Sequence, residues 1–191
     1  MIKDLILKNR SYRRFHQDTP IGMETLKELV DLARISNSGA NKQPLKYILV
    51  CDPETNAKIF DQIGWAGALK DWPGPEEGER PTAYIIVLGD TAIGMAGVDH
   101  GIACTNILLG AVEKGFGGCM LATVKKDVVR TALDIDEKYE ILLVVALGKP
   151  KELVQLDTVD GAGPTVYWRD NNQVHHVPKR KLEDIIVKTV G

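Results

Sequence analysis

Residues 9–15, Asn-Arg-Ser-Tyr-Arg-Arg-Phe, place three arginines and a serine in one short stretch of the chain. A guanidinium group binds a phosphate through two parallel hydrogen bonds, and the hydroxyl of Ser11 can add a further donor. Because Arg10 and Arg13 follow a short helical pattern over residues 1–8, they can lie on one side of the backbone. One interpretation is therefore an anion site, most naturally for a phosphate. The alternative is a solvated basic helix end, where the cations offset the helix dipole.

No other group of residues forms a reactive set. None of the four histidines stands at metal-ligand spacing from a cysteine or carboxylate, no serine lies in a nucleophile elbow, and no Gly-Lys-Ser/Thr loop occurs. His175 and His176 would point to opposite faces of a strand, which suits a surface ladder better than a metal site. The glycines of residues 115–118 would let the backbone approach a flat ligand closely. We expect no catalytic side chain and no metal site.

The elements that position these residues follow from hydrophobic periodicity. Expected helices span residues 23–35, 53–63, 91–114, 125–133 and 182–187. Expected strands span residues 46–51, 83–89 and 140–148, with short strands near 167–168 and 175–177. The 91–114 pattern is apolar nearly all round, apart from Asp99, His100 and Asn106, so this helix should be buried at the centre of the domain or between subunits.

Residues 64–81 form a long loop rich in glycine, proline and glutamate. Loops of this length in compact domains are usually functional or disordered, and Trp65 and Trp72 argue against plain disorder. Two interpretations remain open: a lid over a pocket, or a surface loop whose tryptophans pack against the core or a subunit contact.

The chain has 191 residues and a net charge of −2, which suits one domain and gives no overall field for nucleic acid or an anionic membrane. Three cysteines at unrelated spacings suggest a reducing compartment. No signal peptide opens the chain, and no stretch is apolar enough to span a bilayer. We therefore expect a cytoplasmic protein that binds neither nucleic acid nor a membrane.

Four segments, in this order, resemble the FMN-dependent nitroreductase family over nearly the whole chain. They are Arg-Ser-Tyr-Arg-Arg-Phe (10–15), Asn-Ser-Gly-Ala-Asn-Lys-Gln-Pro (37–44), Gly-Phe-Gly-Gly-Cys-Met-Leu-Ala (115–122) and Lys-Arg (179–180). The resemblance implies an α+β fold, with a mostly antiparallel central sheet wrapped by helices, as a single FMN-binding domain over residues 1–191. It also implies an intertwined homodimer with two FMN molecules at the subunit interface, and the 91–114 helix would form much of the dimer core.

The resemblance also implies roles for individual residues. Those expected to hold the FMN phosphate and ribityl chain are Arg10, Ser11, Arg13 and Arg180. Those expected to reach the flavin from the partner subunit are Asn37, Ser38, Gly39 and Asn41. Those expected to lie along the flavin ring, with backbone groups offered to its edge, are Met120, Leu121 and Ala122. The chain departs from the family at Asn9, Asn37 and Leu45, where members often carry arginine, proline and tryptophan.

The implied activity is an FMN-dependent oxidoreductase. NAD(P)H would reduce the flavin, and nitroaromatics, quinones or similar electron-poor acceptors would reoxidise it by a ping-pong mechanism. A flavin enzyme tolerates a site without acid, base or nucleophile, because the cofactor carries the chemistry. Two alternatives remain: a flavin-binding, flavin-consuming or reductive dehalogenase-type member of the same superfamily, and a dimeric anion-binding module without flavin.

Overall fold

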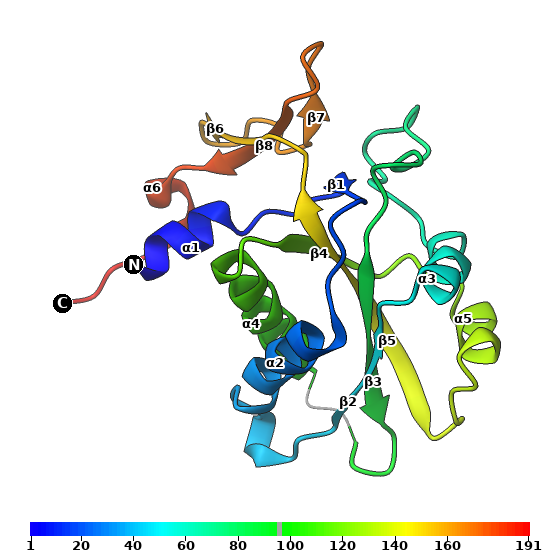
Figure 1. The fold of residues 1–191 in the computed structure, drawn as a ribbon. Helices are drawn as coiled ribbons and strands as arrows, with labels where there is room; N and C mark the ends of the chain where they lie inside the picture. The colour runs from blue at the N-terminus through cyan, green and yellow to red at the C-terminus, as the bar shows by residue number, and fades with distance from the viewer. Residues whose placement is uncertain (95–96) are drawn as a thin grey trace. The chain divides into compact units, whose positions relative to one another are not determined.

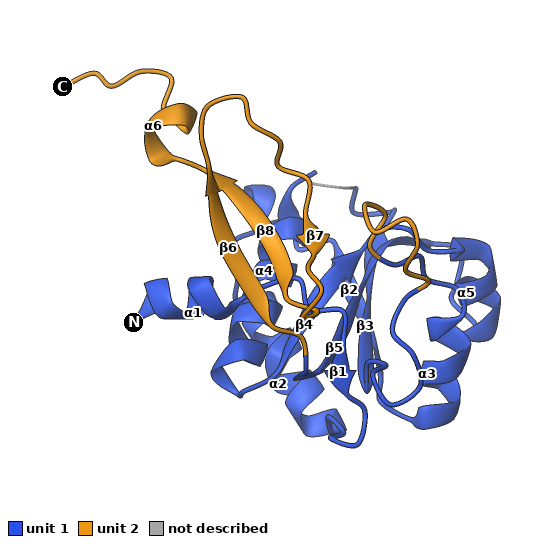
Figure 2. Ribbon diagram, turned by 90° about the horizontal axis from the view of Figure 1, so that it is seen from above, with its two compact units in different colours: residues 1–65, 74–151 blue, residues 66–73, 152–191 orange. Residues whose placement is uncertain are grey.

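The computed structural model describes residues 1–94 and 97–191 and divides the chain into two compact units (Figure 2). Unit 1 comprises residues 1–65 and 74–151, and unit 2 comprises residues 66–73 and 152–191. That both units belong to one FMN-binding domain, as expected from the sequence, stays a prediction. Within residues 1–94 and 97–191, no helix is both long enough and apolar enough to cross a membrane.

Unit 1 contains a five-stranded sheet whose paired strands all run antiparallel (Figure 1). Its strands are β1 (Phe15–His16), β2 (Leu45–Val50), β3 (Ala83–Asp90), β4 (Gly117–Leu121) and β5 (Tyr139–Pro150). β5 is central, since β3 pairs with one of its edges while β1 and β4 pair with successive parts of the other. The register places Tyr84 and Cys119 on either side of Ala146.

Helices cover both faces of this sheet (Figure 1). α2 (Met23–Arg34) and α4 (Asp99–Glu113) lie on one face, and α3 (Pro53–Phe60) and α5 (Lys126–Ala132) lie on the other. α1 (Ile2–Lys8) contacts α4, and a 3-10 turn, η1 (Gly39–Asn41), precedes β2. Side chains alternate along β3, so Ile85 and Val87 join the core beneath α2 and α4, whereas Tyr84 and Ile86 face the side of α3 and α5. The helical and strand periodicities of the sequence therefore predicted both the helices and the strands that they cover.

α4 is shorter than its apolar pattern predicted. The expected helix began at residue 91, but residues 91–93 and 97–98 form turns and α4 begins at Asp99; Met95 and Ala96 lie outside the described residues. The Asp90 carboxylate accepts a hydrogen bond from the Ala92 N–H at 3.1 Å, and Gly94 has a φ of 77°. This aspartate and glycine turn chemistry overrides the apolar pattern before the helix starts.

Unit 2 holds a three-stranded sheet made of β6 (Val154–Val159), β7 (Trp168–Arg169) and β8 (His175–Arg180), followed by α6 (Leu182–Ile185). β6 runs parallel to β8, and β7 runs antiparallel to it. The sequence predicted β7 and β8 but missed β6. His175 corrects the expectation of a surface ladder, because its side chain is buried beside the buried carboxylate of Glu152.

Candidate functional site

Residues 10–15, the arginine-rich segment, lie against β4 in unit 1. Ser11 forms a parallel bridge with Gly118, and the Tyr12 N–H donates to the Gly118 carbonyl at 3.0 Å. Two segments that the sequence analysis singled out, residues 10–15 and 115–122, are therefore backbone neighbours. Gly117 and Gly118 permit this approach: a Cβ at Gly117 would lie 2.6 Å from the Tyr12 ring, and one at Gly118 would lie 2.1 Å from the Ala146 carbonyl oxygen.

These contacts correct the interpretation of the glycine-rich segment. Its glycines were expected to admit a flat ligand, but at Gly117 and Gly118 the space that a Cβ would need is taken by protein atoms. These two glycines thus serve close packing of the chain on itself. The part of β4 that remains accessible is Met120, whose side chain is 41% exposed, while Leu121 alternates inward and is 6% exposed. Ala122 is exposed at the end of the strand.

Arg10 has hydrogen-bonding capacity that the described structure does not use. Its Nη2 donates to the Ile6 carbonyl at 2.7 Å, but its buried Nε has no hydrogen-bond partner within residues 1–94 and 97–191. An unmet buried donor costs about 1–3 kcal/mol, and a charged donor costs more. Arg13, half-buried nearby, donates from Nη1 to the Ser11 carbonyl at 3.3 Å, and the Ser11 side chain is exposed. This donor set suits an anion.

Arg14 has a different role from its two neighbours. Its Nε and Nη2 donate to the two carboxylate oxygens of Glu79 at 2.5 and 2.6 Å, and the Lys151 ammonium lies 2.9 Å from the same carboxylate. The Arg14 guanidinium, and then Lys151, hold the pKa of Glu79 at about 2, well below its ordinary value of 4.5. Arg14 is therefore a structural cation that ties residues 14 and 79 together.

The loop at residues 37–43 is held by α4. The Ser38 hydroxyl donates to the buried Asp99 carboxylate at 2.6 Å, and the Gly39 N–H donates to its other oxygen at 3.0 Å. Ser38 also accepts from the Gln43 N–H at 2.9 Å. Three non-glycine residues here, Ala40, Asn41 and Gln43, have φ values of 50–53°. Such backbone persists only where its surroundings fix it, and it concentrates at functional sites.

A second polar residue of α4 fixes the start of this loop. The Asn106 amide donates to the Ser36 hydroxyl at 2.5 Å, and that hydroxyl donates to the Leu32 carbonyl at 2.8 Å. In the sequence, Asp99 and Asn106 stand out only as polar insertions in an apolar helix. That pattern is the signal that could have identified them, because a buried polar side chain requires a partner.

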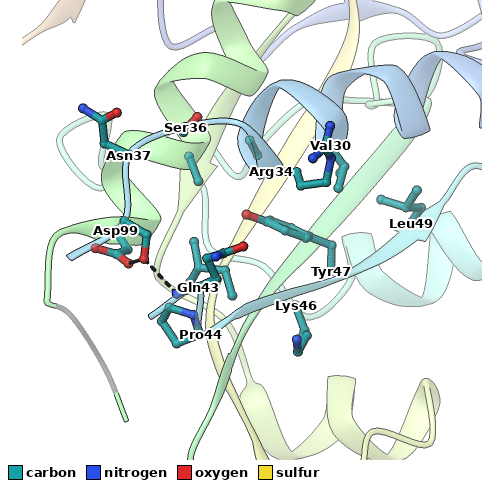
Figure 3. Close-up of a pocket in the computed structure, with 14 residues that line it drawn as sticks. Val30, Arg34, Ser36, Asn37, Gln43, Pro44, Lys46, Tyr47, Leu49 and Asp99 are labelled. Carbon is teal, nitrogen blue, oxygen red and sulfur yellow. Dashed lines mark hydrogen bonds between the residues drawn. The ribbon is translucent and has the colours of Figure 1, made fainter. Parts of the chain in front are cut away.

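A cavity of about 390 Å³ opens beside the loop, lined in part by Asn37, Ser38, Tyr47 and Asp99 (Figure 3). Burial, and then the nearby Cys104 and Asp99, raise the pKa of Tyr47 to about 12, so its phenol is protonated at neutral pH. The side chains of Asn37 and Asn41 are exposed to a ligand or a partner chain, and Gly39 is exposed although its N–H already donates to Asp99. Arg10, Ser11, Arg13 and Met120 do not line this cavity.

Arg180 belongs to unit 2, at the end of β8. Its Nη1 donates to the Gly161 carbonyl, and the Gly161 N–H donates to the Asp184 carboxylate at 2.9 Å. The side chain is otherwise exposed and its guanidinium retains further donors.

The two tryptophans of the 64–81 loop fall in different units. Trp65 is 9% exposed and packs in unit 1 against Phe60, with ring centroids 5.7 Å apart. Trp72 is half-buried in unit 2, where the Arg169 guanidinium lies 4.5 Å from its ring centroid. For Trp65 the burial agrees with the packing interpretation, while Trp72 keeps both interpretations open.

Residues 6–149 match the model of the Nitroreductase family. A Bacillus subtilis (strain 168) protein named "Putative NAD(P)H nitroreductase MhqN" is 22% identical over 189 residues, covering 77% of this chain and 87% of that protein. The fold resembles a nitroreductase family protein from Clostridium novyi NT, with a TM-score of 0.65, 26% identity, and coverage of 79% of this chain and 87% of that one. It also resembles an FMN-dependent nitroreductase from Clostridium difficile R20291, with a TM-score of 0.63, 21% identity, and coverage of 80% and 88%. The expected α+β fold with an antiparallel sheet is confirmed.

Proposed function

Because the chain belongs to the nitroreductase family, we propose that it is an FMN-dependent oxidoreductase that uses NAD(P)H to reduce electron-poor acceptors such as nitroaromatics or quinones. The observation that carries the proposal is the unmet buried Nε of Arg10, on a segment bridged directly to β4. The names of the relatives support the two cofactors: MhqN is named for NAD(P)H, and the Clostridium difficile structure is described as FMN-dependent.

The donor set on unit 1 fits the phosphate end of FMN. Arg10 and Arg13 offer guanidinium donors and Ser11 offers an exposed hydroxyl, the chemistry that binds a phosphate dianion. Arg180, whose guanidinium is exposed in unit 2, is a further candidate donor to a phosphate. Arg14 is excluded from this role, because both of its carboxylate-facing nitrogens are occupied by Glu79.

When bound, FMN would supply the redox chemistry, taking up hydride from the nicotinamide and passing electrons to the acceptor. The residues of this chain would bind and position it. In the proposal Met120 packs against the ring through its exposed side chain, while Leu121 and Ala122 offer backbone groups to the ring edge. The nicotinamide would leave after reducing the flavin and the acceptor would take its place, which gives ping-pong kinetics.

The proposal includes a homodimer in which Asn37, Ser38, Gly39 and Asn41 complete the flavin site of the partner. Among them, Ser38 would act by fixing the loop, because its hydroxyl already donates to Asp99. The loop is strained and held by α4, and Asn37, Gly39 and Asn41 are exposed on it for such a contact. The half-sites of one chain would then be incomplete without the other.

Apolar surface on unit 1 supports this assembly. Ile2, Ile6 and Ile35 are exposed, although each is large and apolar. A cavity of about 450 Å³ nearby is lined by apolar side chains that include Ile35, Ile102 and Leu109. Ile102 and Leu109 are only half-buried on a helix whose pattern is apolar nearly all round, so a second subunit would provide the missing cover. The cytoplasmic setting expected from the sequence remains part of the proposal.

The test is a visible absorbance spectrum of the purified protein, followed by anaerobic titration with NADH and NADPH and by turnover with menadione or nitrofurazone. The proposal expects a yellow protein that is bleached by reduced nicotinamide and reoxidised by the acceptor. A colourless protein that takes up no added FMN would overturn it. Bound FMN without turnover would instead favour a flavin-consuming or dehalogenase-type member.

A further inference from the structure

Unit 1 contains a third cavity, of about 400 Å³, on the face of the sheet that carries α3. Residues lining it include Cys51, Asn56, Phe60, Arg80, Thr82 and Tyr84. They come from the end of β2, from α3, and from the entry into β3. None of the residues assigned to FMN lines this cavity, so the proposed function does not account for it.

Three buried polar atoms of these lining residues have no hydrogen-bond partner in the described part of the chain. They are Arg80 Nε, Asn56 Oδ1 and the Tyr84 hydroxyl. Asn56 is 8% exposed and Tyr84 is 0% exposed, so bulk water does not compensate them. Native interiors rarely leave such atoms unmet, and three around one cavity point to an occupant.

The surroundings hold two of these groups in fixed orientations. The Arg80 guanidinium lies 4.3 Å from the Phe60 ring centroid, its Nη1 pairs with Glu77 at 3.1 Å, and its backbone N–H donates to Gln17 at 3.0 Å. The Asn56 Nδ2 donates to the Thr82 carbonyl at 2.8 Å. That bond assigns the amide orientation, so Oδ1 is the acceptor left for a ligand. A site with such preorganised groups binds without a large ordering cost.

We propose that this cavity, the Arg80 pocket, binds a small aromatic carboxylate that carries a ring hydroxyl. The carboxylate accepts from Arg80 Nε, and the ring hydroxyl donates to Asn56 Oδ1. The ring lies among Phe60, Ala57 and Pro81, which line the same cavity. Burial raises the pKa of Tyr84, so its phenol stays protonated and can donate to the carboxylate.

The charge and size of the pocket favour a monocarboxylate over a phosphate. Arg80 is the cation among its lining residues, and Glu77, which also lines the pocket, already takes one of its nitrogens. A phosphate dianion would have to share the Arg80 guanidinium with Glu77, and the Glu77 carboxylate would repel it. A volume of about 400 Å³ falls near the small end of ligand pockets, which suits a single-ring molecule.

The experiment is isothermal titration of the purified 191-residue chain with 4-hydroxybenzoate, with benzoate and phenol as matched probes. We expect 4-hydroxybenzoate to bind more tightly than either probe, because each probe lacks one polar contact. Arg80→Gln should weaken binding about tenfold or more, the range for a charged hydrogen bond. Tyr84→Phe should weaken it severalfold. Lys58→Gln, which removes an exposed cation of α3 that does not line the pocket, should leave it unchanged.

A second readout identifies the place of binding. Cys51 lines the pocket and is the partly exposed cysteine, whereas Cys104 and Cys119 are buried. Saturating 4-hydroxybenzoate should therefore slow Cys51 labelling by a thiol reagent. No binding at millimolar concentration would overturn the proposal, as would binding that neither Tyr84→Phe nor Arg80→Gln changes. Tyr84→Phe removes only a hydroxyl without a partner, so it tests the proposal even if Arg80→Gln fails to fold.

Discussion

Glu79→Gln should lower the free energy of unfolding by about 3 kcal/mol at neutral pH, and this loss should vanish in acid. The folded state holds the Glu79 pKa at about 2, against an ordinary value of 4.5. Each pH unit of that difference corresponds to about 1.4 kcal/mol, which gives about 3 kcal/mol for the ionised carboxylate. Because the Glu79 side chain is 6% exposed, solvent screening reduces this value little. Glutamine keeps the size and one acceptor oxygen, so the substitution mainly removes the charge.

The pH dependence has a definite sign. Since the folded pKa lies below the unfolded one, the contribution of Glu79 is fully present above about pH 4.5 and is lost as the pH falls through about 2. Urea unfolding of wild type and Glu79→Gln, at equal protein concentration and at pH 7, 5.5, 3.5 and 2.5, measures the difference. The two proteins should differ fully at pH 7 and 5.5, and the difference should shrink to about 1 kcal/mol at pH 2.5.

Glu24→Gln is the matched control, because Glu24 pairs with Lys27 at 2.7 Å on the exposed face of α2. An exposed ion pair contributes at most about 1 kcal/mol, so this variant should stay close to wild type at every pH. A Glu79→Gln loss that is equal at pH 7 and pH 2.5 would refute the reasoning, because the contribution would then come from packing and not from charge. A loss no larger than that of Glu24→Gln would refute it as well.

Four further predictions concern the proposed function and the two tryptophans of the 64–81 loop. Arg10→Ala should weaken FMN binding by about 1.5–3 kcal/mol in a fluorescence titration and leave riboflavin binding nearly unchanged, because only FMN carries the phosphate; equal effects on both ligands would contradict the phosphate role. Ile102→Asp combined with Leu109→Asp should shift the protein toward monomer in sedimentation velocity, since both half-buried side chains line the apolar cavity; an unchanged dimer would place the interface elsewhere. Trp65→Ala should cost about 3 kcal/mol of stability in urea unfolding, because its ring is buried on Phe60. Trp72→Ala should instead change the rate ratio between small and bulky quinones at full flavin occupancy, and unchanged ratios would leave Trp72 a packing role.

Hydrophobic periodicity located helices α1 to α5 and three of the five strands of unit 1, β2, β3 and β5, because each of these strands contains a run of apolar residues. β1 and β4 were not predicted as strands. The predicted strand at residues 83–89 corresponds to β3, and the predicted helix start at residue 53 corresponds to the start of α3. Errors came where local turn chemistry competes with the pattern, as before α4. β6 was missed because its burial alternates only weakly along a polar segment, and its pairing with β8 is not local.

The candidate site was less predictable than the fold, because the partner of a polar residue can lie far away in sequence. Residues 10–14 contain three arginines that look alike in the sequence, yet Arg14 is paired with a residue 65 positions away. The different roles of Arg14 and Arg10 can be recognised only in the folded chain. Asp99 is a similar case, since its role in holding Ser38 and Gly39 depends on a contact across about 60 positions.

The tie between Arg14 and Glu79 also bears on how the anion site is kept in place. The Phe15 N–H donates to the Glu79 carbonyl at 2.9 Å, and the Lys151 N–H donates to the Arg14 carbonyl at 3.0 Å. These bonds fix the backbone directly after Arg13, while the Ser11 and Gly118 bridge fixes it directly before. Arg13 therefore extends from a backbone anchored on both sides, and Arg10 directly precedes the anchor at Ser11, which limits the entropy lost when the two side chains close on a phosphate. Arg14, which binds no ligand in this proposal, thus helps to position Arg13.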